Sequence, residues 1–330
     1  MLKPYFTPDP NQGMIVTQKT LRKKTPGGPY TNLTPTMVMQ LSAPHTWSAA
    51  IMPVFLSVCI SAAQGCAINP LMFLVLMLIC ILMQSAVNAL NDCMDYVKGA
   101  DTLENQLDPT DAVLVYNNVN PTQVLLLVAA QLAFSLALGV YVIVSTSLIT
   151  LCIGLAGMAV LVFYSVGKVP LSYLPLGEFA SGFTMGGLET LACTYALTGT
   201  FSWFPLLVSL PLMCTIGLIN FTNNTCDIEK DVKANRKTLS VHLGRQRSRR
   251  GYKGLLFASL ALMCLVVGLF YTRGLMVCLC MLAAGYPLLK ALCANPLMLQ
   301  TRGAAMAQAV SVNITFNAFY CAAILFGSTA

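Results

Sequence analysis

Nine runs of predominantly apolar residues dominate this chain and restrict the folds open to it. A helix needs about 20 such residues to cross the hydrocarbon core of a bilayer, and each run has roughly that length. Only 9% of the 330 residues are charged, whereas a soluble domain carries about 25%. The sequence therefore predicts an all-α integral membrane protein, a bundle of nine transmembrane helices. The expected spans are 46–64, 70–96, 121–144, 147–165, 175–198, 203–226, 252–271, 274–293 and 304–327.

Positive charge predicts how these spans are oriented. With a cytoplasmic N-terminus, nine spans place every one of the 19 Lys and Arg residues except Arg273 on the cytoplasmic side, as the positive-inside rule requires. The net charge of +7 is then explained by topology and by attraction to anionic lipid, and it calls for no nucleic-acid partner. We expect residues 1–40, which are polar, to form a flexible cytoplasmic arm, and residues 41–330 to form the membrane domain.

A polar cluster breaks the apolar pattern at the cytoplasmic end of the second span. Its members stand at positions i, i+3, i+4 and i+7, which lie on one face of a helix. Asp101 follows in the loop beyond Gly99. The four members of the cluster are Asn88, Asn91, Asp92 and Asp95.

A second cluster repeats this helical spacing at the end of the sixth span, on the same side of the membrane. It again combines an Asn-rich turn with two aspartates one turn apart. The repetition suggests that the two helix ends have a common role. The members of the second cluster are Asn220, Asn223, Asn224, Asp227 and Asp231.

The free energy needed to place charged residues inside a membrane limits the roles that these clusters can have. An Asp at the centre of a transmembrane helix costs about 2.5–3.5 kcal/mol to insert, and less near the interface. Clustered carboxylate and amide oxygens suit a hard cation, above all Mg²⁺, which keeps several waters and readily binds phosphate. A single cluster would also fit ordinary charges solvated at a helix end. Two matching clusters on one side of the membrane favour a shared cation site.

The same residues carry a resemblance to a known family. The segment 91–101, NDCMDYVKGAD, resembles the first aspartate motif of the UbiA superfamily of membrane prenyltransferases, most closely its MenA branch, the 1,4-dihydroxy-2-naphthoate polyprenyltransferases. The Asn223, Asp227 and Asp231 spacing, followed by RKTLSVHLG, resembles the second motif. A third stretch, from Tyr164 to Glu178, resembles the family's segment between spans four and five. The resemblance covers roughly residues 40–330.

This resemblance implies a UbiA-like bundle that binds Mg²⁺ and a polyprenyl diphosphate and transfers the prenyl group to an aromatic acceptor, 1,4-dihydroxy-2-naphthoate in menaquinone synthesis. It also implies a cytoplasmic (inner) membrane location, with the N-terminus and the site loops facing the cytoplasm. The expected metal ligands are Asp92, Asp95, Asp227 and Asp231, with Asp101 as a further base or loop ligand. The expected substrate contacts are Asn88, Asn91, Lys98, Tyr164, Lys168, Asn223, Asn224, Arg236 and Lys237.

Glu189 is a separate candidate, because it lies within the fifth span, three turns beyond Glu178 and on the same helical face. An intramembrane carboxylate is a functional candidate by default. It could accept a hydrogen bond or a proton from a phenolic acceptor, or it could pair with a Tyr or Thr inside the bundle. The chain also departs from the family pattern, because residues 99–167 contain no Lys or Arg and Ser42–His45 include no Lys or Arg before the first span.

Two further functions fit the sequence less well. One keeps the fold and changes the chemistry, as a UbiA-type transferase with another aromatic acceptor or as a terpene cyclase. The other is a transporter of a divalent cation or a proton, since acidic clusters also occur along ion pathways. Transporter sites lie near the bilayer midplane, whereas both clusters here lie towards one face of the membrane, which favours the enzyme.

Overall fold

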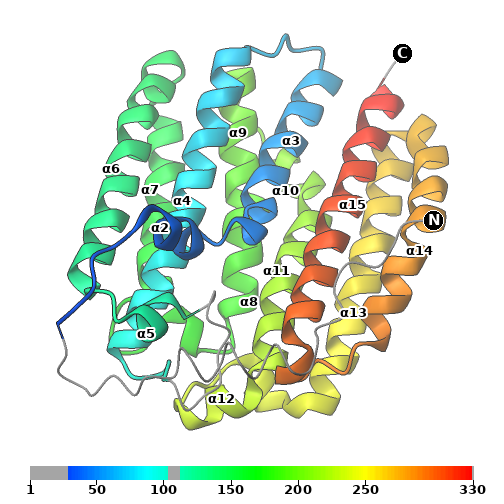
Figure 1. Cartoon of the computed structure of the whole chain (residues 1–330). Coiled ribbons are helices and arrows are strands. Elements are labelled where there is room, and N and C mark those ends of the chain that lie inside the picture. Colours follow the sequence, from blue (N-terminus) through cyan, green and yellow to red (C-terminus); the bar gives the residue numbers. More distant parts are fainter. Residues whose placement is uncertain (1–28, 103–111, 329–330) are drawn as a thin grey trace, which may run out of the picture.

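The computed structural model describes residues 29–102 and 112–328, and helices make up most of this part of the chain. The long helices stand side by side as a bundle, and the short helix α12 (Ile228–Lys233) lies at one end of it (Figure 1). Within the described ranges, β-type pairing is limited to an isolated bridge between Thr31 and Val119. The predicted all-α class is confirmed.

Local capping signals fix the beginnings of the long helices. The side chain of Asn69 accepts hydrogen bonds from the backbone at the start of α4 (Pro70–Val97). Asn120 caps α6 (Pro121–Ser145) in the same way, and each of these helices begins with proline. Proline suits this position because its fixed φ fits a helix and its missing N–H would be unpaired there. The predicted boundaries of these spans lie within one residue of the observed ones.

Six described helical segments are long and apolar enough to cross a membrane, judged by length and composition. A seventh results if α2 (Pro35–Ser42) and η1 (Pro44–Thr46) are counted with α3 (Ser48–Ala63), which they meet at an angle of 54°. A multi-pass membrane protein is therefore confirmed. The six segments are α4, α6, α7 (Leu148–Ser165), α13 (Leu239–Phe270), Thr272–Ala294 with α14 (Leu275–Ala294), and Leu299–Ser328 with α15 (Arg302–Ser328).

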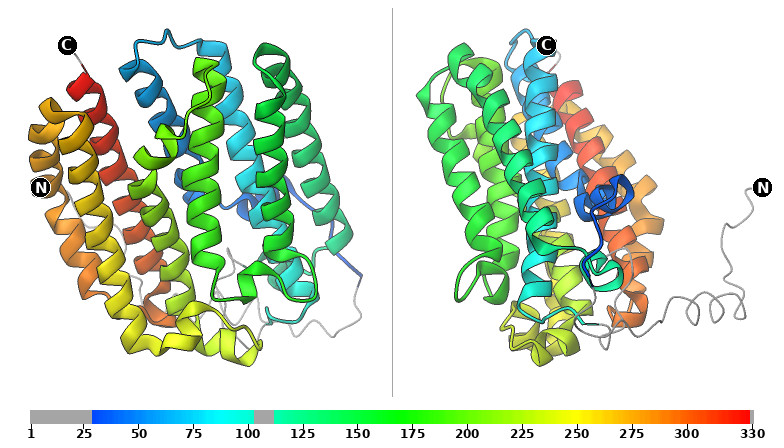
Figure 2. Two further views of the ribbon diagram at one scale, coloured as in Figure 1. Left: turned by 180° about the vertical axis from the view of Figure 1, so that it is seen from behind. Right: turned by 60° about the vertical axis from the view of Figure 1, so that its left-hand side comes forward.

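The fifth and sixth predicted spans are each built from shorter consecutive helical segments, so the six or seven long apolar helices do not reproduce the predicted count of nine. Seen from behind, the parts of the fifth span form one continuous rod between α7 and α11 (Figure 2). Its parts are α8 (Gly177–Ser181), the π-helical segment η4 (Gly182–Leu188) and α9 (Glu189–Thr198). The sixth span consists of α10 (Phe204–Val208) and α11 (Leu210–Cys226).

The described part of the expected N-terminal arm packs on the bundle. Thr34 caps α2, which lies against α4 (Figure 1). The backbone N–H of Leu33 donates a hydrogen bond of 2.8 Å to the side chain of Gln123 in α6. The helix α2, which begins before the expected boundary at residue 41, therefore packs on the bundle. Residues 1–28 of the expected arm lie outside the described residues.

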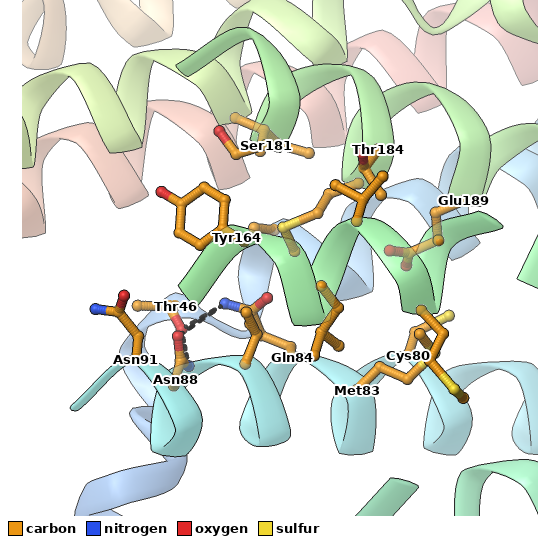
Figure 3. A pocket seen from close by; sticks show the side chains of 18 of the residues that line it. Thr46, Cys80, Met83, Gln84, Asn88, Asn91, Tyr164, Ser181, Thr184 and Glu189 are labelled. Atoms are coloured by element: carbon orange, nitrogen blue, oxygen red, sulfur yellow. Dashed lines mark hydrogen bonds between the residues drawn. The ribbon is translucent and has the colours of Figure 1, made fainter. Parts of the chain in front are cut away.

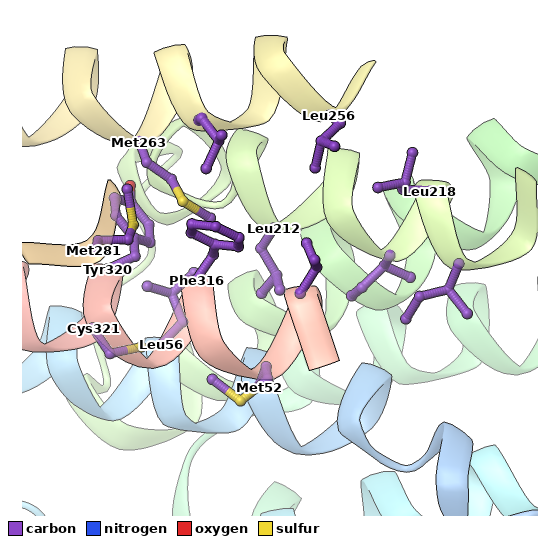
Figure 4. Packing of buried hydrophobic residues seen from close by; sticks show 14 of the residues in the cluster. Met52, Leu56, Leu212, Leu218, Leu256, Met263, Met281, Phe316, Tyr320 and Cys321 are labelled. Atoms are coloured by element: carbon purple, nitrogen blue, oxygen red, sulfur yellow. The ribbon is translucent and has the colours of Figure 1, made fainter. Parts of the chain in front are cut away.

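The apolar core has two main parts. One is formed by α3, α11, α13, α14 and α15, around fully buried side chains such as Leu212, Met263 and Phe316 (Figure 4). The other is formed by α2, α4, α6 and α7 together with the short α5 (Val113–Asn117). A smaller cluster of α3, α4, α6 and α9 residues connects the two. The cavity described below lies between the helices of these two core clusters.

A buried polar network holds α11 to α15. The hydroxyl group of Thr215 donates a 2.8 Å hydrogen bond to Asn313, and the amide of Asn317 donates one of 2.9 Å to Thr215. All three side chains belong to residues no more than 2% exposed. Hydrogen bonds of this kind join helices in a membrane, where the burial of apolar surface gives little driving force.

Replacing Gly186 with Ala is expected to destabilise the fold. A Cβ atom at this position in η4 would lie 2.7 Å from the Cα atom and 2.8 Å from the backbone nitrogen of Met213 in α11. We expect the free energy of unfolding to fall by about 1–3 kcal/mol, the usual cost of overpacking. Thermal unfolding in detergent measures this loss of stability. Gly254→Ala is the control, because nothing lies within 4 Å of its Cβ position, and equal melting temperatures for both variants would contradict the packing.

Candidate active site

The two aspartate-bearing segments, far apart in the sequence, meet at the end of the bundle where α12 lies (Figure 1). Arg236, which follows α12, forms an ion pair with Asp95 near the end of α4. Its Nη1 atom lies 3.7 Å from Oδ1 of Asp231. The side chain of Arg236 is only 9% exposed, so both contacts are shielded from water. Arg236 thus joins the two clusters.

A cavity of about 460 Å³ extends from this polar end into the apolar interior. Asn88 and Asn91 lie at one end of its α4 wall, and Cys80 and Glu189 lie at the other (Figure 3). The helical rise puts Asn91 and Cys80 about 16 Å apart along α4. A polar end and a long apolar remainder suit a ligand with a charged head and a hydrocarbon tail. Apolar lining residues include Leu76, Met83, Val142, Leu151, Leu161 and Leu188.

Asn88 fixes α4 to the segment that leads into α3. Its amide donates hydrogen bonds of 2.8 Å to the hydroxyl of Thr46 and 3.1 Å to the carbonyl of Ser42. Gln84, one turn earlier, donates to the same hydroxyl at 3.1 Å (Figure 3). Both amide hydrogens of Asn88 are thus engaged within the protein, and the contacts of this residue position the cavity wall.

Asn91 connects α4 to the end of α7. It accepts a hydrogen bond of 3.2 Å from the hydroxyl of Ser165 and donates one of 3.3 Å to Asp95. Next to Ser165, the hydroxyl oxygen of Tyr164 accepts a 2.8 Å hydrogen bond from Asn220 of α11. The ends of α4, α7 and α11 are therefore linked around the polar end of the cavity.

Three basic residues line this end, and each contacts an aspartate. Besides Arg236 these are Lys230, whose Nζ lies 2.7 Å from Asp101, and Arg302 at the start of α15. The Nε atom of Arg302 lies 3.3 Å from Asp227 and 3.0 Å from the side-chain oxygen of Asn223. Burial lowers the pKa of Lys230, but the carboxylates of Asp101 and Asp227 outweigh it and raise this pKa. Lys230 is therefore a fixed positive charge.

Asp231 supports Arg236 from outside the cavity. Burial raises the pKa of Asp231 to about 7, although the charge of Arg236 opposes the shift. The hydroxyl of Thr238 donates a 3.2 Å hydrogen bond to its carboxylate. The ring of Tyr173 packs against the guanidinium group of Arg236, whose central carbon lies 4.6 Å from the ring centroid. Together these groups hold Arg236 in place.

Ten of the residues predicted from the sequence line the cavity: Asn88, Asn91, Asp92, Asp95, Asp101, Tyr164, Glu189, Asn223, Asp227 and Arg236. The other five, Lys98, Lys168, Asn224, Asp231 and Lys237, are not part of the lining. Lys168 and Lys237 are exposed, as is Lys98, which donates a 3.0 Å hydrogen bond to the carbonyl of Ser165. Asn224 donates one of 2.8 Å to Glu178.

The prediction that Glu178 and Glu189 share a helical face is wrong. The π-helical segment η4 lies between them, and its wider turn rotates the following residues relative to a regular helix. Glu178 consequently faces Asn224 of α11, whereas Glu189 faces the deep end of the cavity beside Cys80 (Figure 3). No feature of the sequence except the glycines of η4 signals this change.

The cavity also contains two basic residues that the motif pattern does not single out. Lys230 lies between the two aspartates of the second cluster, so its position could have been noticed in the sequence. Arg302 is an isolated basic residue before the last span, 75 positions from Asp227, and only the tertiary structure brings it to the site. It brings a positive charge to a site to which residues 99–167 contribute no Lys or Arg.

The described oxygen donors approach the cavity from two sides. Within residues 29–102 and 112–328, no three His, Cys, Asp or Glu side chains form a ready-made metal cluster. Asp92 and Asp95 line the cavity from α4, Asn223 lines it from α11, and Asp227 lines it from the junction of α11 and α12. The Oδ1 atom of Asp227 is buried and accepts no hydrogen bond from the described residues. This set fits a hard cation whose remaining ligands are water or phosphate oxygens.

Comparison with known proteins places this geometry in a family. The model of the UbiA prenyltransferase family matches residues 50–324. The 1,4-dihydroxy-2-naphthoate octaprenyltransferase of Bacillus subtilis (strain 168) is 35% identical over 237 residues, which cover 72% of this chain and 74% of that protein.

Solved structures share the fold at low sequence identity. A UbiA homologue from Aeropyrum pernix K1 superposes with a TM-score of 0.62 and 16% identity, covering 86% of this chain and 97% of that one. A UbiA homologue from Archaeoglobus fulgidus, bound to DMAPP and Mg²⁺, gives a TM-score of 0.59 and 15% identity, covering 87% and 98%. On the family match and the B. subtilis relative, this chain belongs to the UbiA prenyltransferase family.

Proposed function

We propose that this prenyltransferase moves a polyprenyl group from a polyprenyl diphosphate to 1,4-dihydroxy-2-naphthoate, a step of menaquinone synthesis. The observation that carries the proposal is the cavity itself. Its polar end combines aspartates from two distant segments with three basic residues, and its remainder is apolar. The name of the B. subtilis relative supports the choice of acceptor and of a polyprenyl donor.

The charges at the polar end support diphosphate binding. Arg236, Lys230 and Arg302 offer guanidinium and ammonium donors, which form strong hydrogen bonds with phosphate oxygens. Each of them contacts an aspartate. A bound diphosphate would exchange some of these contacts for its own oxygens, and the aspartates would then be available to a cation.

Mg²⁺ fits the oxygen donors, and the A. fulgidus homologue is bound to Mg²⁺ with DMAPP. We propose Asp92, Asp95 and Asp227 as its ligands on this chain, with Asp101 next to them. Asp231, Asn88, Asn224 and the exposed lysines act as supporting residues in this proposal. When bound, the ion neutralises charge on the diphosphate and makes it a better leaving group.

The residues around the polar end suit the chemistry of prenyl transfer. The bond between the first prenyl carbon and the diphosphate oxygen breaks, an aromatic ring carbon of the acceptor bonds to the prenyl carbon, and a ring proton is released. Lys230, Arg236 and Arg302 stabilise the charge that develops on the departing diphosphate. Tyr164, held by Asn220 at the boundary of the polar and apolar parts, presents an aromatic ring near the reacting carbon.

The charge distribution supports the proposed orientation, with the N-terminus and the polar end of the cavity in the cytoplasm. We also propose nine spans. The interrupted rods from α8 to α9 and from α10 to α11 would each count as one span, and α3 would be the first. The cytoplasmic membrane of the cell is the compartment that this topology and the bacterial relative support.

The test of the proposed function uses the purified protein in nanodiscs with Mg²⁺, farnesyl or geranylgeranyl diphosphate and 1,4-dihydroxy-2-naphthoate. We expect pyrophosphate release and a prenylated naphthalene product by mass spectrometry, both abolished by EDTA. Release of pyrophosphate with a cyclised or hydrolysed donor and no prenylated acceptor would instead indicate another acceptor or a terpene cyclase. No release from folded protein with either donor would contradict prenyl transfer altogether.

Arg302→Gln is expected to weaken donor binding more than it slows turnover. The variant removes a positive charge that lines the polar end. The amide of the introduced Gln can still donate a hydrogen bond to Asn223. We expect the KM for the prenyl diphosphate to rise about tenfold, the size of a lost charged hydrogen bond. Arg273→Gln, a loss of the same charge outside the cavity lining, is the control. A donor KM equal to that of the unaltered protein would contradict this role.

A further inference from the structure

Glu189 is a carboxyl group in the deep, apolar part of the cavity. Its Oε1 atom is buried and accepts no hydrogen bond from the described residues, the thiol of Cys80 hydrogen-bonds with the carboxyl group, and the thiol of Cys193 lies nearby. No Lys or Arg occurs in residues 99–167 or 169–229, so α6, α7, α9 and α11 offer it no cation. The polar end of the cavity, marked by Asn88 and Asn91, lies at the opposite end of the α4 wall from Glu189 (Figure 3).

The fold directs this carboxyl group into the cavity. The π-helical segment η4 immediately precedes Glu189, and such segments are rare and are frequently found at functional sites. Its Gly186 and Gly187 let Met213 of α11 approach closely, which holds the segment in place. Thr190, the next residue, is fully buried and donates a 2.7 Å hydrogen bond to the carbonyl of Gly186. The packing of the backbone before and after Glu189 therefore fixes the direction of its side chain.

The distance from the polar end to Glu189 corresponds to a definite tail length. Asn91 and Cys80 are about 16 Å apart along α4. An extended isoprene unit, with four carbons in its main chain, spans about 5 Å at ordinary carbon–carbon bond lengths. An extended tail of two units therefore stops short of the depth of Cys80 and Glu189, and an extended tail of four units reaches it.

We infer that Glu189 marks the end of the tail site and selects the donor by the length of its prenyl chain. The inference rests on the proposed function, because it assumes that the diphosphate binds at the aspartate end. A hydrocarbon tail packed against a carboxyl group deprives that group of hydrogen bonds, in either protonation state, and this costs free energy. A longer tail can avoid the carboxyl by bending towards lipid past Leu136 and Leu155, which line the cavity and are about half exposed.

The test compares two donors, geranyl and geranylgeranyl diphosphate, with the same acceptor. The measured quantity is the ratio of kcat/KM for the four-unit donor to that for the two-unit donor. Glu189→Leu, which keeps the volume and removes the polar group, is expected to raise this ratio about tenfold, the size of a desolvated polar group. Glu189→Gln, which stays polar, is expected to leave it within about twofold. Glu189→Met serves as a second apolar variant if the Leu variant does not fold.

The outcomes separate this inference from the proposed function. If the unaltered protein transfers both groups and the apolar variants leave the ratio unchanged, the tail-length inference is wrong and the proposed function stands. An equal loss of kcat for both donors in Glu189→Leu and Glu189→Gln would assign the carboxyl to the reaction itself and also overturn the inference. If the unaltered protein transfers neither group, both the proposed function and the inference fall.

Discussion

Asp227→Asn is expected to lower kcat/KM for prenyl transfer by about 100-fold or more, in line with the removal of one preorganised group that stabilises a transition state. Asn keeps the shape of Asp and a side-chain oxygen that can accept from Arg302. It removes the negative charge that faces the cavity and weakens any bound cation. The loss therefore concerns chemistry rather than folding, and the melting temperature should stay within a few degrees of that of the unaltered protein.

The measurement is pyrophosphate release at saturating acceptor over a range of donor and Mg²⁺ concentrations. Glu229→Gln is the matched control. It makes the same change of charge two positions along the chain, at a side chain that is 64% exposed and pairs with Arg245. We expect its kcat/KM to stay within about twofold, as for surface substitutions in general. Comparable losses in both variants would show that the cavity position of Asp227 is irrelevant.

Arg236→Leu is expected to destabilise the protein by about 3–5 kcal/mol, the usual cost of removing one partner of a buried ion pair. Two carboxylates, those of Asp95 and Asp231, would lose the cation that they share. The contact with the ring of Tyr173 would be lost as well. Arg236→Lys should recover only part of the loss, because an ammonium group cannot bridge two carboxylates as a guanidinium group does.

Thermal unfolding in detergent, with and without Mg²⁺, measures this effect. Lys237→Leu is the control, since Lys237 is the next residue, is exposed and contacts Tyr173 through its backbone N–H, which the variant keeps. We expect a change below about 0.5 kcal/mol for the control. Similar melting temperatures for the Arg236→Leu and unaltered proteins would mean that the ion pairs do not join the two segments.

Much of the fold could be predicted because lipid imposes strong constraints on sequence. The apolar runs predicted the regular spans closely, and Asn69 and Asn120 cap two of these helices at their predicted starts. The interrupted spans were harder to predict. A π-helical turn at Gly182–Leu188 depends on how closely Met213 packs against its glycines. Because that contact is tertiary, it could not be predicted from the hydropathy of the segment.

The candidate site was only partly predictable for the same reason. Helical spacing predicted which residues share a face, and most of those on α4 and α11 line the cavity. Spacing could not predict that Arg302, from the last span, lies beside Asp227. It also could not predict that Asp231 faces Arg236 and Thr238 behind the cavity wall. Such roles depend on contacts between distant segments.

The central claim is that the two aspartate segments act together on one Mg²⁺-bound diphosphate. The most direct test is a double-mutant cycle with Asp92→Asn, Asp227→Asn and the combined variant. The quantity measured is the Mg²⁺-dependent binding of a thiolodiphosphate analogue of geranyl diphosphate, by calorimetry in nanodiscs. We predict that each single variant loses most of the Mg²⁺-dependent affinity and that the double variant loses little more. Additive losses, or a single variant that binds the analogue normally, would contradict a shared site.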